Sequence, residues 1–124
     1  MGNRSSVFVV DDDASMRISI KRLLGVHGFR AILFDSAKAL FDHDDFDDAI
    51  CIIIDINLNN QSGIGLRRVL SSKGITAPVI YVTGNDSQAS RLAAIESGCL
   101  AYLSKPFTAR SFIDAVERAR MVAV

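Results

Sequence analysis

The sequence predicts one α/β domain in which a parallel five-stranded sheet lies between two layers of helices. Five short apolar segments, rich in β-branched residues, recur at intervals too long for hairpins, and each interval carries a helical pattern. Strands that are apolar on both faces belong in a sheet covered on both sides, and the alternation predicts right-handed crossovers. The predicted strands are 6–10, 31–34, 51–54, 79–82 and 101–103.

The helices are predicted from apolar spacing and from residues that favour helix ends. Met16, Ile20 and Leu24 recur at helical spacing, and Gly28 ends this first helix. Ser36 is a typical cap for a second helix. Three more helices are indicated by Leu66, Val69 and Leu70 before Gly74, by Leu92, Ala93 and Ile95 between Asp86 and Gly98, and by Phe112, Val116 and Ala119 after Thr108.

Length and composition restrict the classes of protein to consider. A chain of 124 residues forms one domain, here 1–124 with a core of about 5–122, and no repeat or linker divides it. Fourteen acidic and fourteen basic side chains cancel, so we expect no direct binding to nucleic acid. We also expect no membrane association, because no apolar stretch approaches the roughly 20 residues of a membrane span. Cys51 and Cys99 suit reduced thiols in a cytoplasmic protein.

Polar side chains stand at the carboxyl ends of four predicted strands. Asp11 and Asp12 follow the first strand, Asp55 the third, Thr83 the fourth and Lys105 the fifth. In an open parallel sheet these ends meet in one crevice. A metal site, a carboxylate acceptor, a hydroxyl and an ammonium together suit phosphoryl transfer, in which the charge on the transferred oxygens must be positioned and neutralised. Asp55 is therefore predicted to be a nucleophile.

The acidic residues in this crevice predict a Mg²⁺ site. Carboxylates brought close together repel one another unless a cation lies between them, and Mg²⁺ prefers oxygen ligands. The predicted ligands are Asp11, Asp12, Asp55 and the backbone carbonyl of Asn57, and Mn²⁺ is a candidate substitute. Lys105 would pair with Asp55 before phosphorylation and with a phosphoryl oxygen afterwards.

The peptide bond between Lys105 and Pro106 is a further candidate feature of the site. An X-Pro bond can be cis at small cost, and a cis bond would turn the lysine inward at the end of its strand. A trans turn before the last helix is equally compatible with the sequence.

Four motifs in order resemble the receiver domain of two-component response regulators over essentially the whole chain. Each motif alone is weak, and their order and spacing make the combination specific. They are Val9-Val10-Asp11-Asp12 with Arg17, Ile54-Asp55 with Gly63 eight residues later, Val82-Thr83-Gly84, and Tyr102-Leu103-Ser104-Lys105-Pro106-Phe107.

The resemblance implies a flavodoxin-like (βα)5 fold with strand order 2-1-3-4-5. Chemotaxis regulators of the same family have this fold. It also implies that Asp55 accepts a phosphoryl group from a histidine kinase or a phosphotransfer protein. By the same analogy, Asp11 and Asp12 bind Mg²⁺, Thr83 moves to bond the phosphoryl group, and Lys105 holds one of its oxygens.

The resemblance further implies a switch that ends at a binding surface. Tyr102 matches the aromatic residue that turns inward when Thr83 moves, which alters the face formed by the fourth helix, fifth strand and fifth helix. This face would control an output domain or partner, by analogy in transcription regulation, and a phosphorylation-linked homodimer is a candidate assembly. Its candidate contact residues are Arg91, Glu96, Tyr102, Arg110 and Arg118. Apart from Tyr102, each is also compatible with a merely solvated helix face.

Three asparagines bear on the lifetime of a phosphorylated state. Asn57 and Asn85 match the positions that flank the attacking water in the family, and their amides could orient water without acting as a base. We therefore expect them to tune dephosphorylation and to give an intermediate lifetime. Asn59 stands where many receivers have proline, which predicts a loop of altered mobility or shape.

Two alternatives accompany the signalling interpretation. A constitutive interaction module of the same fold remains an alternative, although the intact polar set argues against it. A phosphatase resembling haloacid dehalogenases would need an aspartate at Asn57 and room for a cap domain. We therefore expect an enzyme only in the sense that the chain promotes its own phosphoryl transfer and hydrolysis. We expect no output domain within residues 1–124, which suits a stand-alone receiver or part of a longer regulator.

Overall fold

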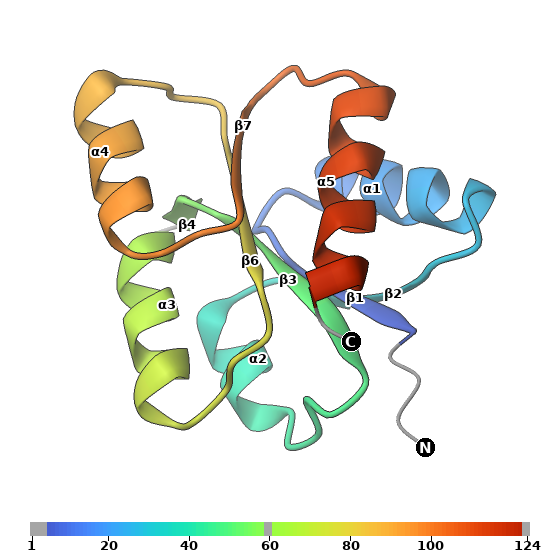
Figure 1. Ribbon diagram of the computed structural model, residues 1–124, viewed down its shortest axis with the longest axis horizontal. Coiled ribbons are helices and arrows are strands. Elements are labelled where there is room, and N and C mark those ends of the chain that lie inside the picture. The colour runs from blue at the N-terminus through green and yellow to red at the C-terminus, as the bar shows by residue number, and fades with distance from the viewer. Residues whose placement is uncertain (1–4, 59–60, 123–124) are drawn as a thin grey trace.

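A parallel five-stranded sheet forms the middle layer of the computed structural model, which describes residues 5–58 and 61–122 (Figure 1). The spatial order β2-β1-β3-β6-β7 equals the predicted order 2-1-3-4-5 when these five strands are numbered along the chain, so the predicted fold class is confirmed. The strands are β1 (Ser6–Val10), β2 (Arg30–Phe34), β3 (Ala49–Asp55), β6 (Val79–Thr83) and β7 (Ala101–Ser104).

Helices cover both faces of the sheet, as a parallel sheet requires (Figure 1). One face carries α1 (Ala14–Val26) and α5 (Ala109–Val122). The other face carries α2 (Ala37–Asp42), α3 (Gly63–Ser72) and α4 (Gln88–Glu96). Among the helices of the described segments, none has the length and apolar character needed to cross a bilayer.

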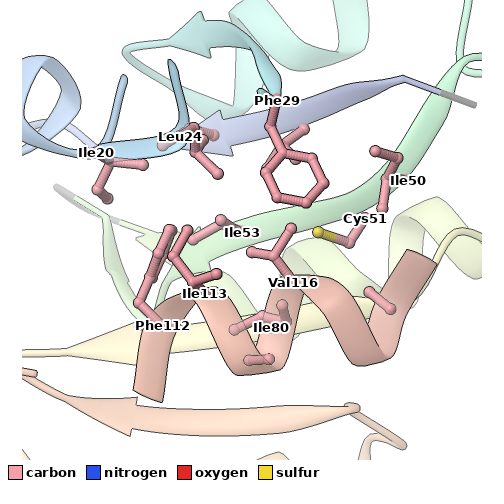
Figure 2. Packing of buried hydrophobic residues seen from close by; sticks show 14 of the residues in the cluster. Ile20, Leu24, Phe29, Ile50, Cys51, Ile53, Ile80, Phe112, Ile113 and Val116 are labelled. Carbon is pink, nitrogen blue, oxygen red and sulfur yellow. The ribbon is translucent and has the colours of Figure 1, made fainter. Parts of the chain in front are cut away.

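The core on the α1 and α5 side explains why successive strand residues are all apolar. Figure 2 shows Ile20 and Leu24 of α1 packed with Phe112 and Val116 of α5 over Ile53 of β3. Alternate residues of the same strands point to the opposite face, where a second core lies under α2, α3 and α4. Every residue of β1, β3 and β6 is buried, so these strands show the continuous apolar pattern of a doubly covered sheet.

Helix α4 packs differently from what its apolar residues suggest. Ala94 is its buried residue, whereas the side chains of Leu92 and Ile95 are 55% and 66% exposed. Ala94 belongs to the core under α2, α3 and α4, whereas the two larger residues remain on the surface. This helix therefore presents apolar side chains to solvent beside β7.

The strands that carry the polar residues extend further than predicted. Asp55 is the last residue of β3, and Thr83 is the last residue of β6. A short hairpin of β4 (Asn57–Leu58) and β5 (Gln61–Ser62) follows β3, and it was not predicted. The expectation for Asn59 concerns a residue outside the described segments.

Gly63 starts α3 close to the end of β3. Its N–H donates to the Ile56 carbonyl oxygen at 2.8 Å. A Cβ atom at this position would lie 2.7 Å from Cγ2 of Ile54 and 2.9 Å from the Cα of Ile56, with the carbonyl oxygen of Asp55 closer still. Gly63 is therefore required by space rather than by backbone conformation.

We predict that Gly63→Ala lowers the free energy of unfolding by about 1–3 kcal/mol, because the added methyl group must displace backbone atoms of β3. Urea denaturation followed by circular dichroism measures this change. Gly65→Ala is the matched control, since its Cβ would meet only Cβ of Ser62 at 3.9 Å. The control is expected to stabilise the helix by up to about 1 kcal/mol. Equal stabilities of the two variants would contradict the packing argument.

Candidate functional site

The predicted site residues meet at the carboxyl edge of the sheet. Asp11 directly follows β1, Asp55 ends β3, Thr83 ends β6 and Lys105 directly follows β7. The register of the parallel strands aligns these ends, because Asp55 pairs with Val82 in β6. Asp11, Asp55 and Thr83 are buried, so the sheet holds three polar side chains in a protected position.

Three carboxylates form an acidic cluster. Asp11, Asp12 and Asp55 each place one carboxylate oxygen so that all three oxygens lie within 4.8 Å of one another. Backbone N–H groups orient two of them: Asp13 donates to Oδ1 of Asp11 and Asn57 donates to Oδ1 of Asp55, each at 2.9 Å. Hard oxygen ligands at this spacing fit Mg²⁺. Asp11, Asp12 and Asp55 could therefore hold the ion together.

Lys105 connects two of the carboxylates. Its Nζ lies 3.1 Å from Oδ2 of Asp11 and 3.3 Å from Oδ2 of Asp55. The Lys105 N–H also donates to the Thr83 carbonyl oxygen at 2.7 Å, which fixes the start of the turn after β7. The Lys105–Pro106 peptide is cis, one of the two forms that the sequence left open. The ammonium thus lies where it can neutralise charge on Asp55.

Burial and the charges in the cluster shift the pKa values of Asp55 and Lys105. Burial raises the pKa of Asp55, and the Asp11 charge raises it further, whereas the Asn57 N–H and Lys105 act in the opposite direction. Burial lowers the pKa of Lys105, but its hydrogen bonds and attraction to Asp11 and Asp55 outweigh this effect and the net shift is upward. One ammonium therefore does not fully compensate the buried carboxylates, and an additional cation would stabilise their charged form.

The Thr83 hydroxyl is held by two donors. Nδ2 of Asn57 lies 3.1 Å from Oγ1 of Thr83, and the N–H of Asn85 lies 3.0 Å from the same oxygen. The sequence singled out all three residues but did not connect Asn57 to Thr83, because contacts 26 residues apart leave no local pattern. Asn57 therefore joins the segment after β3 to the hydroxyl at the end of β6.

Two neighbours of the site have roles that the sequence did not predict. Nη1 of Arg17 donates to the Asp11 carbonyl oxygen at 2.7 Å and so supports the backbone of the acidic cluster. Asp86 accepts a hydrogen bond from the Tyr102 hydroxyl at 2.9 Å. The sequence places Arg17 in a motif, whereas it indicates Asp86 only as the start of a helical interval. Neither contact has a sequence signal, because each depends on how loops approach the sheet.

Comparison with known proteins gives the class of protein to which this arrangement belongs. Residues 7–117 match the family model of the response regulator receiver domain. A receiver structure from Pseudoalteromonas atlantica superposes with a TM-score of 0.90 at 23% identity, covering 96% of this chain and 99% of that one, and so supports the fold. The chain belongs to the response regulator receiver domain family, as its motifs indicated.

Two curated relatives match most of this chain. The chain is 35% identical to transcriptional regulatory protein TdiR of Thauera aromatica, over 95% of this chain and 52% of the relative. It is 33% identical to nodulation protein W of Bradyrhizobium diazoefficiens, over 91% of this chain and 50% of the relative. The chain thus spans about half the length of these relatives.

We predict that Mg²⁺ raises the melting temperature of the wild-type chain by a few degrees, because a ligand that binds only the folded state adds about 1.4 kcal/mol at ten times its Kd. Differential scanning fluorimetry in Mg²⁺ or in Na⁺ of equal ionic strength measures the effect. Asp12→Asn is expected to remove most of it, and Asp44→Asn, an exposed aspartate outside the cluster, is expected to retain it. Equal Mg²⁺ responses in the two variants would refute this assignment of the ligands.

Proposed function

We propose that this chain is a phosphorylation-dependent signalling receiver in which Asp55 accepts a phosphoryl group from a histidine kinase or phosphotransfer protein. The supporting observation is the meeting of Asp11, Asp12 and Asp55 within 4.8 Å, with Lys105 bonded to Asp11 and Asp55. A buried carboxylate acceptor beside a cation site and an ammonium suits phosphoryl transfer.

The proposed reaction assigns each group one role. A carboxylate oxygen of Asp55 forms a bond to phosphorus while the P–N bond of the donor breaks, and the donor nitrogen keeps the electron pair and takes up a proton. Bound Mg²⁺ supplies neutralisation of charge on the phosphoryl oxygens. Lys105, now 3.3 Å from Oδ2 of Asp55, is placed to hold one of those oxygens. The Asn57 backbone carbonyl remains a proposed additional ligand.

The proposed switch carries the change to the surface of α4, β7 and α5. The phosphoryl group adds about two negative charges and strong acceptors, which would attract the Thr83 hydroxyl and allow Tyr102 to turn inward. Tyr102 is half-buried in β7. The remaining candidate contact residues are all exposed in the structure: Arg91, Glu96, Arg110 and Arg118.

The wider role is proposed from the relatives. Transcriptional regulatory protein TdiR is about twice as long as the matched region, which suits a receiver that controls an output domain in transcription regulation. A histidine kinase or phosphotransfer protein would be the phosphoryl donor in the cytoplasm, and phosphorylation-linked pairing of two copies is compatible with the α4, β7 and α5 surface. We propose that residues 1–124 act as a single receiver unit.

A constitutive interaction module of the same fold is the alternative function. Such a module would have no need for the buried charges of Asp11, Asp55 and Lys105, which are costly unless paired. The proposed function accounts for their presence because each has a role in phosphoryl transfer. Phosphorylation of the purified chain separates the two functions.

We predict that incubation with Mg²⁺ and phosphoramidate adds the mass of one phosphoryl group to the wild-type chain and none to Asp55→Asn. Intact-mass spectrometry at short times after mixing measures the product. Asp35→Asn is the matched control and is expected to be phosphorylated like the wild type. Omission of Mg²⁺ should abolish most of the gain. An unmodified wild type would support the constitutive module instead. A phosphorylated Asp55→Asn would refute Asp55 as the acceptor.

We predict that Asn57→Ala and Asn85→Ala each lengthen the lifetime of the phosphorylated chain by about two- to tenfold. The reason is that each amide can orient the attacking water, and one hydrogen bond contributes on the order of 1 kcal/mol. The decay of the phosphorylated mass after removal of the donor gives the lifetime. Asn57→Asp is a useful comparison, because it keeps the shape and adds a charge. Lifetimes unchanged in both alanine variants would exclude the tuning role.

A further inference from the structure

The Asp86 side chain joins the loop after Thr83 to the aromatic residue of the proposed switch. Its Oδ1 accepts a hydrogen bond from the Tyr102 hydroxyl at 2.9 Å. Arg91 in α4 donates to the same carboxylate, through Nε at 2.9 Å and through Nη2 at 2.5 Å. The guanidinium carbon lies 6.0 Å from the centre of the Tyr102 ring. One carboxylate therefore fixes both the Tyr102 ring and the first turn of α4.

The charges of Asp86 and Arg91 favour a hydrogen bond from Tyr102 to Asp86 that is stable but of modest strength. The hydrogen bonds from Arg91, and to a lesser extent from Tyr102, lower the pKa of Asp86 to about 2, so the carboxylate is ionised at neutral pH. An ionised acceptor strengthens the bond from the neutral Tyr102 hydroxyl. The Asp86 and Arg91 side chains are 29% and 59% exposed, which limits the strength of the pair through solvent screening.

The loop also connects Asp86 to the phosphorylation site. The Thr83 hydroxyl accepts the N–H of Asn85 at 3.0 Å, and Asn85 is the neighbour of Asp86 in the chain. If Thr83 turned its hydroxyl toward a phosphoryl group on Asp55, the Asn85 N–H would lose its acceptor. The loop that positions the Asp86 carboxylate would then lose one of its restraints. The states of Thr83 and Tyr102 are thus linked through a short stretch of backbone.

We propose that Asp86 is a positioning residue that holds Tyr102 in its outer position in the unphosphorylated chain and releases it during switching. The inference rests on the proposed function, in which Tyr102 turns inward after Asp55 is phosphorylated. The Tyr102 hydroxyl cannot keep its hydrogen bond to Asp86 while the ring moves inward, so the outer position is stabilised by the energy of that bond. A variant that lacks the bond shifts the equilibrium toward the switched conformation.

The first test observes Tyr102 directly in the full chain labelled with 3-fluorotyrosine. The chain has two tyrosines, and Tyr102→Phe identifies the signal of Tyr102 by removing it. Asp86→Ala is expected to move the Tyr102 signal toward the position that it takes in the wild type with Mg²⁺ and beryllofluoride, a phosphoryl mimic. Asp42→Ala is the matched control, because it breaks a comparable exposed ion pair with Lys38 of 2.8 Å. A Tyr102 signal that stays in place in Asp86→Ala overturns the inference.

The second test measures phosphorylation by phosphoramidate. Asp86→Ala and Tyr102→Phe are each expected to raise the rate about two- to fivefold, the effect of one partly exposed ionic hydrogen bond, and Asp42→Ala should leave it unchanged. The double variant should be no faster than the faster single variant, because both remove the same bond. Unchanged rates in the single variants, or effects that multiply, overturn the inference. A wild type that accepts no phosphoryl group refutes the proposed function, and a moving Tyr102 signal in Asp86→Ala then still supports Asp86 as the residue that holds Tyr102.

Discussion

The repulsion among buried carboxylates at one edge of the sheet is the constraint on which the functional design depends. Asp11 and Asp55 are buried and share the single ammonium of Lys105, and Asp12 lies close to both. Two buried acidic groups with one cation leave an uncompensated charge, which burial makes costly. The site therefore favours the binding of a cation beside Asp55, the acceptor in the proposed function.

The apolar sheet, which is packed on both faces, holds the repelling carboxylates in place. β1, β3 and β6 are fully buried and are packed on both faces, and Gly63 brings α3 into contact with the end of β3. Parallel strands in fixed register place their carboxyl ends together, so each polar side chain needs only to stand at the end of a strand. The apolar core and the polar site are thus two consequences of the same topology.

The sequence was sufficient for the fold and for the polar residues that meet at the carboxyl edge of the sheet, and it was insufficient for contacts made by loops. Buried strands and capped helices have periodic patterns, so the order of elements and the residues at strand ends could be predicted. The exposure of Leu92 and Ile95 could not, because Ala94 takes the contact with the sheet and apolar spacing does not distinguish the two faces. The bond between Asp86 and Tyr102 depends on the path of the loop after β6, for which no pattern exists.

The loop after β6 lies between the acidic site and the surface formed by α4 and β7. Thr83 is buried and its hydroxyl is bonded to Asn57 and Asn85. Asp86, three residues later, is bonded to the half-buried Tyr102 and the exposed Arg91. In the proposed switch, a rearrangement of Thr83 would reach α4 and β7 through the short backbone between Thr83 and Asp86. The modest strength of the exposed contacts is then an advantage, since a switch must have two states of similar free energy. A fully buried pair at Asp86 would fix Tyr102 in one state.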